Sequence, residues 1–238
     1  MKNIFIFTHI PKTAGTSFIN SILYNNFDKI NLYKYQGFKN LLLKDKKKID
    51  VFMGHFPYGG HHFFPGSPKY FTFLREPIQR AISHYYWVKQ TKSNNYEHPE
   101  WKFYDSTPLV DLFSKTKKSS FYFFPLKDNL QTRYLAGLRH GFWLTNKDQM
   151  LDVAKKNLEK YQLLGIQEYY QDSINLFETY FGWSFAPTQR EKSTSSKPVS
   201  FDKSVVQVLE ENHSLDQEIY KMGVEIFNDK LSRKPCLN

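Results

Sequence analysis

The alternation of apolar and polar residues predicts short strands that alternate with helices. Apolar runs of strand length fall at 3–8, 50–53, 70–74 and 161–165. Apolar residues at helical spacing cover 16–27, 77–90, 108–116, 128–137, 148–160, 167–181 and 203–230, the last long enough to be broken in two. Strands separated by helices favour right-handed crossovers and a parallel sheet. We therefore expect an α/β fold, a parallel sheet flanked by helices, in one domain over residues 1–238.

The first strand leads into a loop that has the chemistry of an anion site. The segment IFIFTHIPKTAGTS runs from the strand through Lys12 and Gly15 to a helix that opens at Ser17. Backbone N–H groups converge in such a turn, and the positive end of the helix dipole lies behind them. A Walker A loop places its lysine directly after the last glycine, whereas Lys12 precedes Gly15 by three positions. We expect a cradle for a phosphate-like group; an ordinary turn with a surface lysine is the alternative.

A second strand, turn and helix follow at KYFTFLREPIQRAISHYYWV, residues 69–88. Arg75 stands where the strand ends, and Ser83 lies about two helical turns beyond it. A guanidinium fork and a hydroxyl at the carboxyl end of a parallel strand can hold a phosphate. The alternative is an arginine paired with Glu76 and a solvated serine.

Between these two segments, the strand VFMGH delivers His55 to the same edge of the sheet. Imidazole titrates near neutral pH and can take the proton of a hydroxyl group. The loop that follows is rich in Gly and Pro and contains His61 and His62. A histidine that only hydrogen-bonds within this loop is the alternative for His55, and it is what we expect of His61 and His62.

These motifs resemble those of sulfotransferases that use 3′-phosphoadenosine 5′-phosphosulfate (PAPS). HIPKTAGTS looks most like the carbohydrate branch of that family, and the GH element resembles the heparan sulfate 2-O-sulfotransferase type. The resemblance implies a P-loop-kinase-like sheet, Lys12 and His55 as catalytic residues, and contact of Arg75 and Ser83 with the 3′-phosphate. We expect no metal, because fixed cations and amides take the place that magnesium has in kinases. The resemblance also implies that one run of loop residues holds the 5′-phosphosulfate: Lys12, Thr13, Ala14, Gly15, Thr16 and Ser17.

The resemblance continues beyond residue 90, more loosely. NLQTRYLAG, residues 129–137, is similar to a family element whose arginine would be Arg133, a candidate for contact with an acidic acceptor or the cofactor. A structural ion pair is an equal alternative for Arg133. Residues 163–183 and 215–227 resemble the family's late strand, helix and terminal helix. The stretch after Trp183 departs from the family pattern, so cofactor contacts from that stretch are not expected.

Composition agrees with an anionic partner. The formal charge is +10 and the pI about 9.4, which favours phosphorylated or polyanionic ligands. Cys236 is the only cysteine, which excludes an intrachain disulfide and a cysteine metal site. No apolar run reaches the ~20 residues of a membrane span and no signal peptide is visible, so we expect a cytoplasmic enzyme or an excised domain. Weakly patterned residues 91–128 suggest an insertion that shapes the acceptor cleft.

The sequence thus predicts a PAPS-dependent sulfotransferase that acts on a hydroxyl group. The expected acceptor is a carbohydrate, and acidic carbohydrates are among the candidates. The sulfuryl group would be transferred by an in-line displacement, with a histidine as the base, by analogy with phosphoryl transfer. Two alternatives stay open. One is a nucleotide-dependent phosphotransferase on the same sheet, which the absence of GxxxxGK opposes. The other is a basic nucleic-acid-binding module, for which Lys12 and His55 would have no use.

Overall fold

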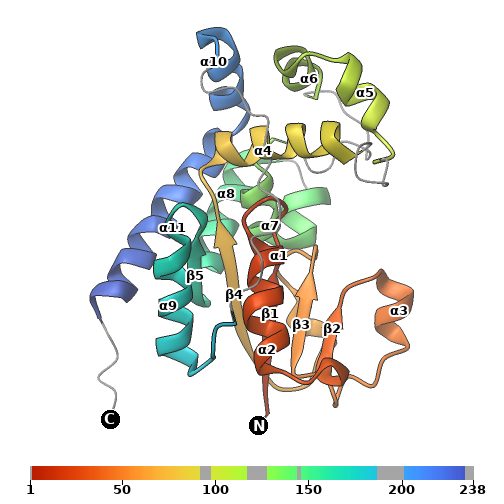
Figure 1. Ribbon diagram of the computed structural model, residues 1–238, viewed down its shortest axis with the longest axis vertical. Coiled ribbons are helices and arrows are strands. Elements are labelled where there is room, and N and C mark those ends of the chain that lie inside the picture. The colour runs from red at the N-terminus through yellow and green to blue at the C-terminus, as the bar shows by residue number, and fades with distance from the viewer. Residues whose placement is uncertain (1, 92–97, 117–127, 144–145, 187–200, 234–238) are drawn as a thin grey trace.

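The computed structural model describes residues 2–91, 98–116, 128–143, 146–186 and 201–233. Their centre is a parallel five-stranded sheet in the order β2-β3-β1-β4-β5 (Figure 1). The strands are β1 (Asn3–Thr8), β2 (Leu32–Lys34), β3 (Val51–Gly54), β4 (Ser67–Leu74) and β5 (Tyr161–Ile166). The α/β class with helices around a parallel sheet is confirmed. Because all strands run the same way, the loops that follow β1, β3 and β4 meet at one edge.

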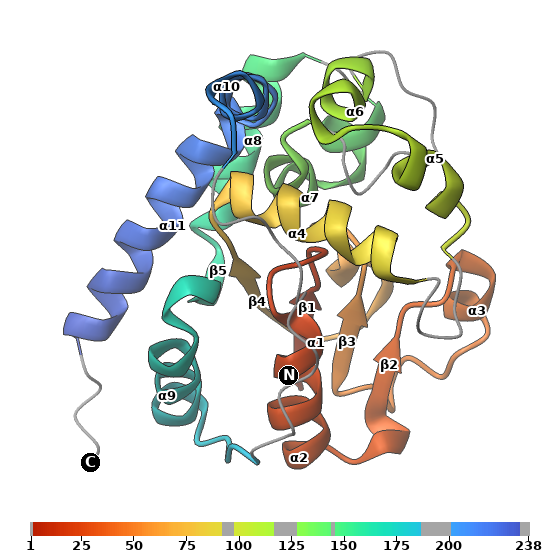
Figure 2. The ribbon, with the colours of Figure 1, turned by 45° about the horizontal axis from the view of Figure 1, so that its top comes forward.

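Helices cover both faces of the sheet (Figures 1 and 2). One face carries α1 (Gly15–Phe18), α2 (Tyr24–Asn26) and α9 (Tyr170–Phe181); the other carries α7 (Leu130–Leu138) and α8 (Lys147–Leu158). The long α11 (Ser214–Ser232) packs along β5, and the short α3 (Phe38–Leu42) stands beside β2. Across the carboxyl ends of the strands runs α4 (Pro77–Gln90), with α5 (Trp101–Ser106), α6 (Leu109–Thr116) and α10 (Lys203–Asn212) beyond it.

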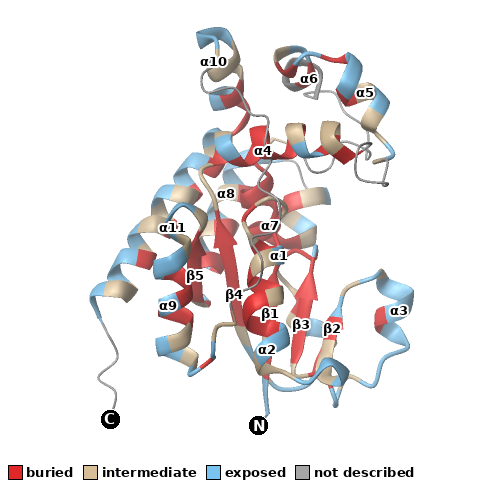
Figure 3. Ribbon diagram, in the orientation of Figure 1, coloured by how far each residue is buried: buried red, intermediate tan, exposed pale blue. Residues whose placement is uncertain are grey.

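Phenylalanine builds the core between the sheet and the α1–α2–α9 layer. Side chains alternate across a strand, so Phe5 and Phe7 of β1 and Phe71 and Phe73 of β4 share a face. They pack on rings of the helices, such as Phe177, which stacks on Phe73 with centroids 5.6 Å apart. Strand β3 is completely buried, and β1, β4 and β5 are buried over most of their length (Figure 3). Much of the high phenylalanine content therefore fills this core.

Local capping fixes the start of α4, the helix that passes over the strand ends. Pro77 occupies its first turn, and the Glu76 carboxylate accepts hydrogen bonds from the N–H groups of Ile78 and Gln79 at 3.1 and 2.7 Å. Both features satisfy or remove N–H groups that the first turn leaves unpaired. The cap holds Arg75, one residue upstream, at the junction between β4 and α4.

Most predicted elements are present, with small shifts at their ends. The helix expected over 16–27 is interrupted by a π turn at Ile19–Leu23, and the stretch 203–230 is broken at His213 into α10 and α11. The pattern did not predict β2, α3 or α5, of three, five and six residues, because such short elements show no full period. Among the described residues, none of the helices is long and apolar enough to cross a membrane.

Candidate active site

The loop after β1 is held in a strained backbone conformation. Lys12 and Ala14 both have a φ of 69°, in the left-handed region, and Thr13 between them does not. Left-handed residues at such positions are typical of anion-binding nests, in which successive N–H groups face one side. A non-glycine residue in this region costs about 1–3 kcal/mol and persists only where its surroundings enforce it. The Thr13 hydroxyl supplies part of that enforcement, because it is buried and donates to the Ile10 carbonyl at 2.9 Å.

The start of α1 packs tightly against His9. A Cβ at Gly15 would lie 2.2 Å from Cδ2 of His9, so only glycine fits there. The His9 ring is itself buried, with its centroid 5.6 Å from Phe7 and 4.4 Å from His55. Burial, with the nearby His55 and lysine charges, lowers the pKa of His9 well below the usual histidine value. His9 is therefore a neutral spacer between the loop and His55.

His55 is oriented by the loop after β1. The Nδ1 atom of His55 lies 2.7 Å from the carbonyl oxygen of His9. Because a carbonyl only accepts, Nδ1 carries the proton, and in the neutral ring Nε2 keeps its lone pair. The residue has an exposed surface, although protein atoms closely surround the imidazole. This crowding lowers the pKa of His55; the bond to His9 opposes the shift and the charge of Lys34 adds to it.

Arg75 meets the same loop from β4. Its Nη1 donates to the Lys12 carbonyl oxygen at 3.2 Å, and its Nε lies 4.0 Å from Oε1 of Glu168. Nε is buried and has no hydrogen-bond partner. Burial lowers the pKa of Arg75 and the Glu168 and Glu76 carboxylates oppose the shift; an arginine stays charged regardless. Nε thus faces the Glu168 carboxylate at ion-pair distance, and the guanidinium places a positive charge beside the loop, which suits an incoming anion.

The remaining predicted cofactor residues fall into two groups. Thr16 is exposed and Ser17 half-buried at the start of α1, on the open side of the loop. Ser83 is only 3% exposed, on the buried side of α4. The Lys12 ammonium lies 5.1 Å from the ring centroid of Trp87, farther along α4, in cation–π contact. Trp87 is a residue that the sequence analysis missed, and its helical spacing gave no sign of it.

Arg133 makes the structural ion pair that the sequence left as the alternative. Its Nη2 donates to the Asp128 carboxylate at 2.9 Å, and Nε and Nη1 donate at 2.7 Å to the carbonyls of Asp128 and Gly141. The side chain is 8% exposed. All three guanidinium nitrogens are thus engaged inside the protein, so we assign Arg133 to the scaffold.

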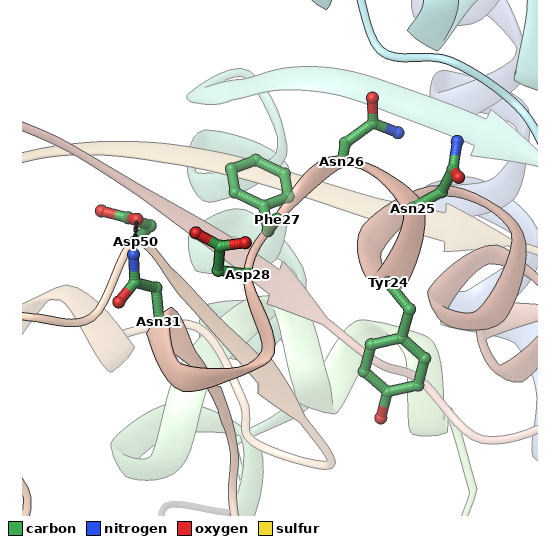
Figure 4. A pocket seen from close by; sticks show the side chains of 7 residues that line it. All are labelled: Tyr24, Asn25, Asn26, Phe27, Asp28, Asn31 and Asp50. Atoms are coloured by element: carbon green, nitrogen blue, oxygen red, sulfur yellow. Dashed lines mark hydrogen bonds between the residues drawn. The ribbon is translucent and has the colours of Figure 1, made fainter.

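A polar pocket of about 350 Å³ lies elsewhere, at the opposite edge of the sheet (Figure 4). Asp50 and Asn31, which lie just before β3 and β2, line it together with residues after α1, and their side chains are joined by a 2.8 Å hydrogen bond. Lys12 and Arg75 belong to the carboxyl edge. The pocket is therefore separate from the candidate active site.

Comparisons with known proteins agree with the motifs. A heparan sulfate 2-O-sulfotransferase of Caenorhabditis elegans is 28% identical over 203 residues, 74% of this chain and 60% of that protein. Heparan sulfate 2-O-sulfotransferase 1 of Mus musculus is 26% identical over 74% of this chain and 54% of its own length. Heparan-sulfate 6-O-sulfotransferase 2 of Gallus gallus is 26% identical, over 66% of this chain and 44% of its own. The resemblance to carbohydrate sulfotransferases is confirmed, and the chain spans about half the length of the curated relatives it matches.

No protein-family model matches the chain. Among solved structures, a mouse sulfotransferase complexed with PAP covers all of this chain and 85% of its own, at 12% identity and a TM-score of 0.29. That score is too low to bear on the fold or the site, and the sequence relatives carry the comparison.

Proposed function

We propose that this chain transfers the sulfuryl group of PAPS to a hydroxyl group of a carbohydrate. The observation that carries the proposal is the meeting of three motifs that are far apart in the sequence. Arg75 donates to the carbonyl of Lys12, and His55 is bonded to the carbonyl of His9, in the same loop. Sequence similarity to heparan sulfate 2-O- and 6-O-sulfotransferases supports both the reaction and the acceptor class.

The residues present fit an anionic nucleotide. The left-handed residues Lys12 and Ala14 of the loop after β1 are typical of anion-binding turns, and the Arg75 guanidinium adds a positive charge beside them. In the proposal the loop residues Lys12–Ser17 bind the 5′-phosphosulfate, and Arg75 with Ser83 binds the 3′-phosphate. PAPS supplies an activated sulfuryl group with a good leaving group. Lys12 places positive charge where the leaving oxygen becomes negative, which stabilises the transition state.

His55 is the base in this proposal. Its Nδ1–H is held by the His9 carbonyl, so Nε2 can accept the hydroxyl proton of the acceptor. The acceptor oxygen forms the new bond to sulfur as the bond from sulfur to the bridging phosphate oxygen breaks. The proton ends on His55 and the negative charge on the departing bisphosphate. Positioning and fixed charge account for most of the catalysis, as in phosphoryl transfer.

Nucleotide binding tests the assignment of Arg75. Calorimetry should show that adenosine 3′,5′-bisphosphate binds far more tightly than 5′-AMP or ATP. Since a charge-assisted hydrogen bond contributes about 1.5–3 kcal/mol, Arg75→Ala should weaken bisphosphate binding by about 10-fold or more and leave AMP nearly unchanged. The matched control is Arg233→Ala, an exposed arginine paired with Asp229 at the end of α11. Equal affinity of the unaltered protein for bisphosphate and AMP would contradict the proposal.

A further inference from the structure

A glutamine side chain takes the place of a neighbouring strand beside Arg75. The last residue of β4, Leu74, pairs with Ile166 of β5. Gln131 of α7 provides both bonds for the next residue: its Oε1 accepts from the Arg75 N–H at 3.0 Å and its Nε2 donates to the Arg75 carbonyl at 2.8 Å. Gln131 is completely buried. These two bonds fix the backbone from which the guanidinium extends.

Gln131 is in turn fixed by α11. The Asp216 carboxylate accepts from the N–H of Gln131 at 3.1 Å, and from the N–H and hydroxyl of Thr132, both at 2.7 Å. Asn129 adds hydrogen bonds in the opposite direction: its Oδ1 accepts from the N–H groups of Leu215 and Asp216 at 2.8 and 3.1 Å. The NLQTR element therefore joins the start of α7 to the start of α11. This joint explains a motif that no catalytic role accounts for.

A second connection runs from α11 to the Arg75 side chain. The Tyr220 hydroxyl donates to Oε2 of Glu168 at 2.9 Å. The other oxygen, Oε1, accepts from the Glu76 N–H at 3.1 Å and lies 4.0 Å from Nε of Arg75. Asp216 and Tyr220 are four residues apart, one helical turn, and so share a face of α11.

We infer that α11 positions Arg75 for the 3′-phosphate through two connections, Asp216–Gln131 to its backbone and Tyr220–Glu168 to its side chain. Gln131 and Glu168 are positioning residues, which act on the nucleotide only through Arg75. The inference rests on the proposed function, because it takes Arg75 to contact the 3′-phosphate. Tyr220 lies farther from the nucleotide and is coupled to it through Glu168.

The test is the ratio of affinities for adenosine 3′,5′-bisphosphate and 5′-AMP, measured by calorimetry. Tyr220→Phe removes one hydroxyl at a half-buried position and should lower that ratio by about 3- to 10-fold, the value of one hydrogen bond. Gln131→Met should lower it at least as much, because both backbone bonds are lost. The matched control is Tyr180→Phe on α9, which should leave the ratio unchanged. Melting temperatures verify that each variant is folded.

A double variant separates positioning from general damage. If Tyr220 acts through Arg75, adding Tyr220→Phe to Arg75→Ala should cause no further loss of the ratio. If Arg75→Ala strongly lowers the affinity ratio and Tyr220→Phe leaves it unchanged, the inference is overturned and the proposed function stays intact. If Arg75→Ala itself keeps the ratio, the assignment of the 3′-phosphate fails, and the inference fails with it.

Discussion

At the scale of single residues, one hydrogen bond decides what His55 can do. A neutral imidazole has one donor and one acceptor nitrogen, and the partner of one fixes the other. The His9 carbonyl accepts a hydrogen bond from the proton-bearing Nδ1 of His55, which leaves Nε2 as the acceptor. His61 differs, because its Nδ1 lies 2.8 Å from the Tyr70 hydroxyl, which also accepts the N–H groups of Gly59 and His61. Those hydrogen bonds hold the loop together, so in the proposed reaction His55 rather than His61 is the expected base.

The rate of sulfuryl transfer should depend on the ionisation of His55. A base works only when neutral, so the rate should fall as the pH drops through its pKa. Crowding lowers the pKa of His55, which places the acid limb below the ordinary histidine value of about 6.5. His55→Ala should cost about 10²–10⁴ in turnover, the usual contribution of a positioned base, and leave bisphosphate binding nearly unchanged. The measurement is PAPS-dependent sulfate transfer to uronic-acid, hexose and aryl-alcohol acceptors across pH 5–9.

The exposed His62 provides the control for this prediction. His62→Ala should keep close to full turnover, because the residue lies in the loop beyond β3 and not at the strand end. Near-full activity of His55→Ala, or a parallel loss of bisphosphate binding, would show that the base lies elsewhere.

Sequence reasoning found the residues at strand ends and missed those that hold them. Lys12, His55 and Arg75 follow β1, β3 and β4, and parallel strands bring their ends together, so their meeting could be expected. Gln131 and Glu168 lie 56 and 93 positions beyond Arg75 in the sequence, and pairing at that distance follows from helix packing that no local pattern encodes. The two roles of Arg133 could not be separated for the same reason. Its partners include the Gly141 carbonyl, which a turn after α7 brings within reach.

At the scale of elements, the contact between the end of β1 and the start of α1 couples the loop after β1 to His55. Gly15 begins α1 directly beneath the His9 ring, and the His9 carbonyl holds His55. The ring cannot move aside freely, because it is stacked on Phe7 and lies against His55. A side chain at position 15 would therefore disturb the loop and the base together.

Gly15→Ala tests this coupling. Overpacking of a buried contact usually costs about 1–3 kcal/mol, so the free energy of unfolding should fall by that amount, and both bisphosphate affinity and turnover should drop. His9→Ala removes the ring that the new methyl group meets and keeps the backbone carbonyl. The free energy of unfolding of the double variant Gly15→Ala/His9→Ala should therefore be higher than the value expected from adding the losses of the two single variants. Strict additivity in denaturant unfolding would contradict the proposed clash.

At the scale of the whole molecule, three buried histidines surround the carboxyl edge of the sheet. His9 follows β1, His84 lies on α4, and His213 joins α10 to α11. Burial lowers the pKa of each, that of His213 to about 4, with the positive charge of Arg80 as the next cause for His84 and His213. Asp216 opposes the shift for His213. Protonation of these histidines therefore opposes folding at the carboxyl end of the sheet, where the candidate active site lies.

Stability should fall as the pH drops below about 6.5, where these histidines begin to take up protons in the unfolded chain. Their pKa values are lower in the folded protein, so between the two values the unfolded chain binds more protons and acid favours it. For His213 the window extends down to about 4, its folded pKa, and each histidine contributes up to about 1.4 kcal/mol per pH unit while only the unfolded chain takes up its proton. Denaturant unfolding at pH 8, 7, 6 and 5 measures the slope of unfolding free energy against pH.

His84→Phe replaces a buried ring whose two nitrogens have no hydrogen-bond partner. The substitution should therefore flatten this slope between pH 7 and 5 and cost little stability at pH 8. A slope unchanged by this substitution would show that His84 does not contribute to the acid sensitivity.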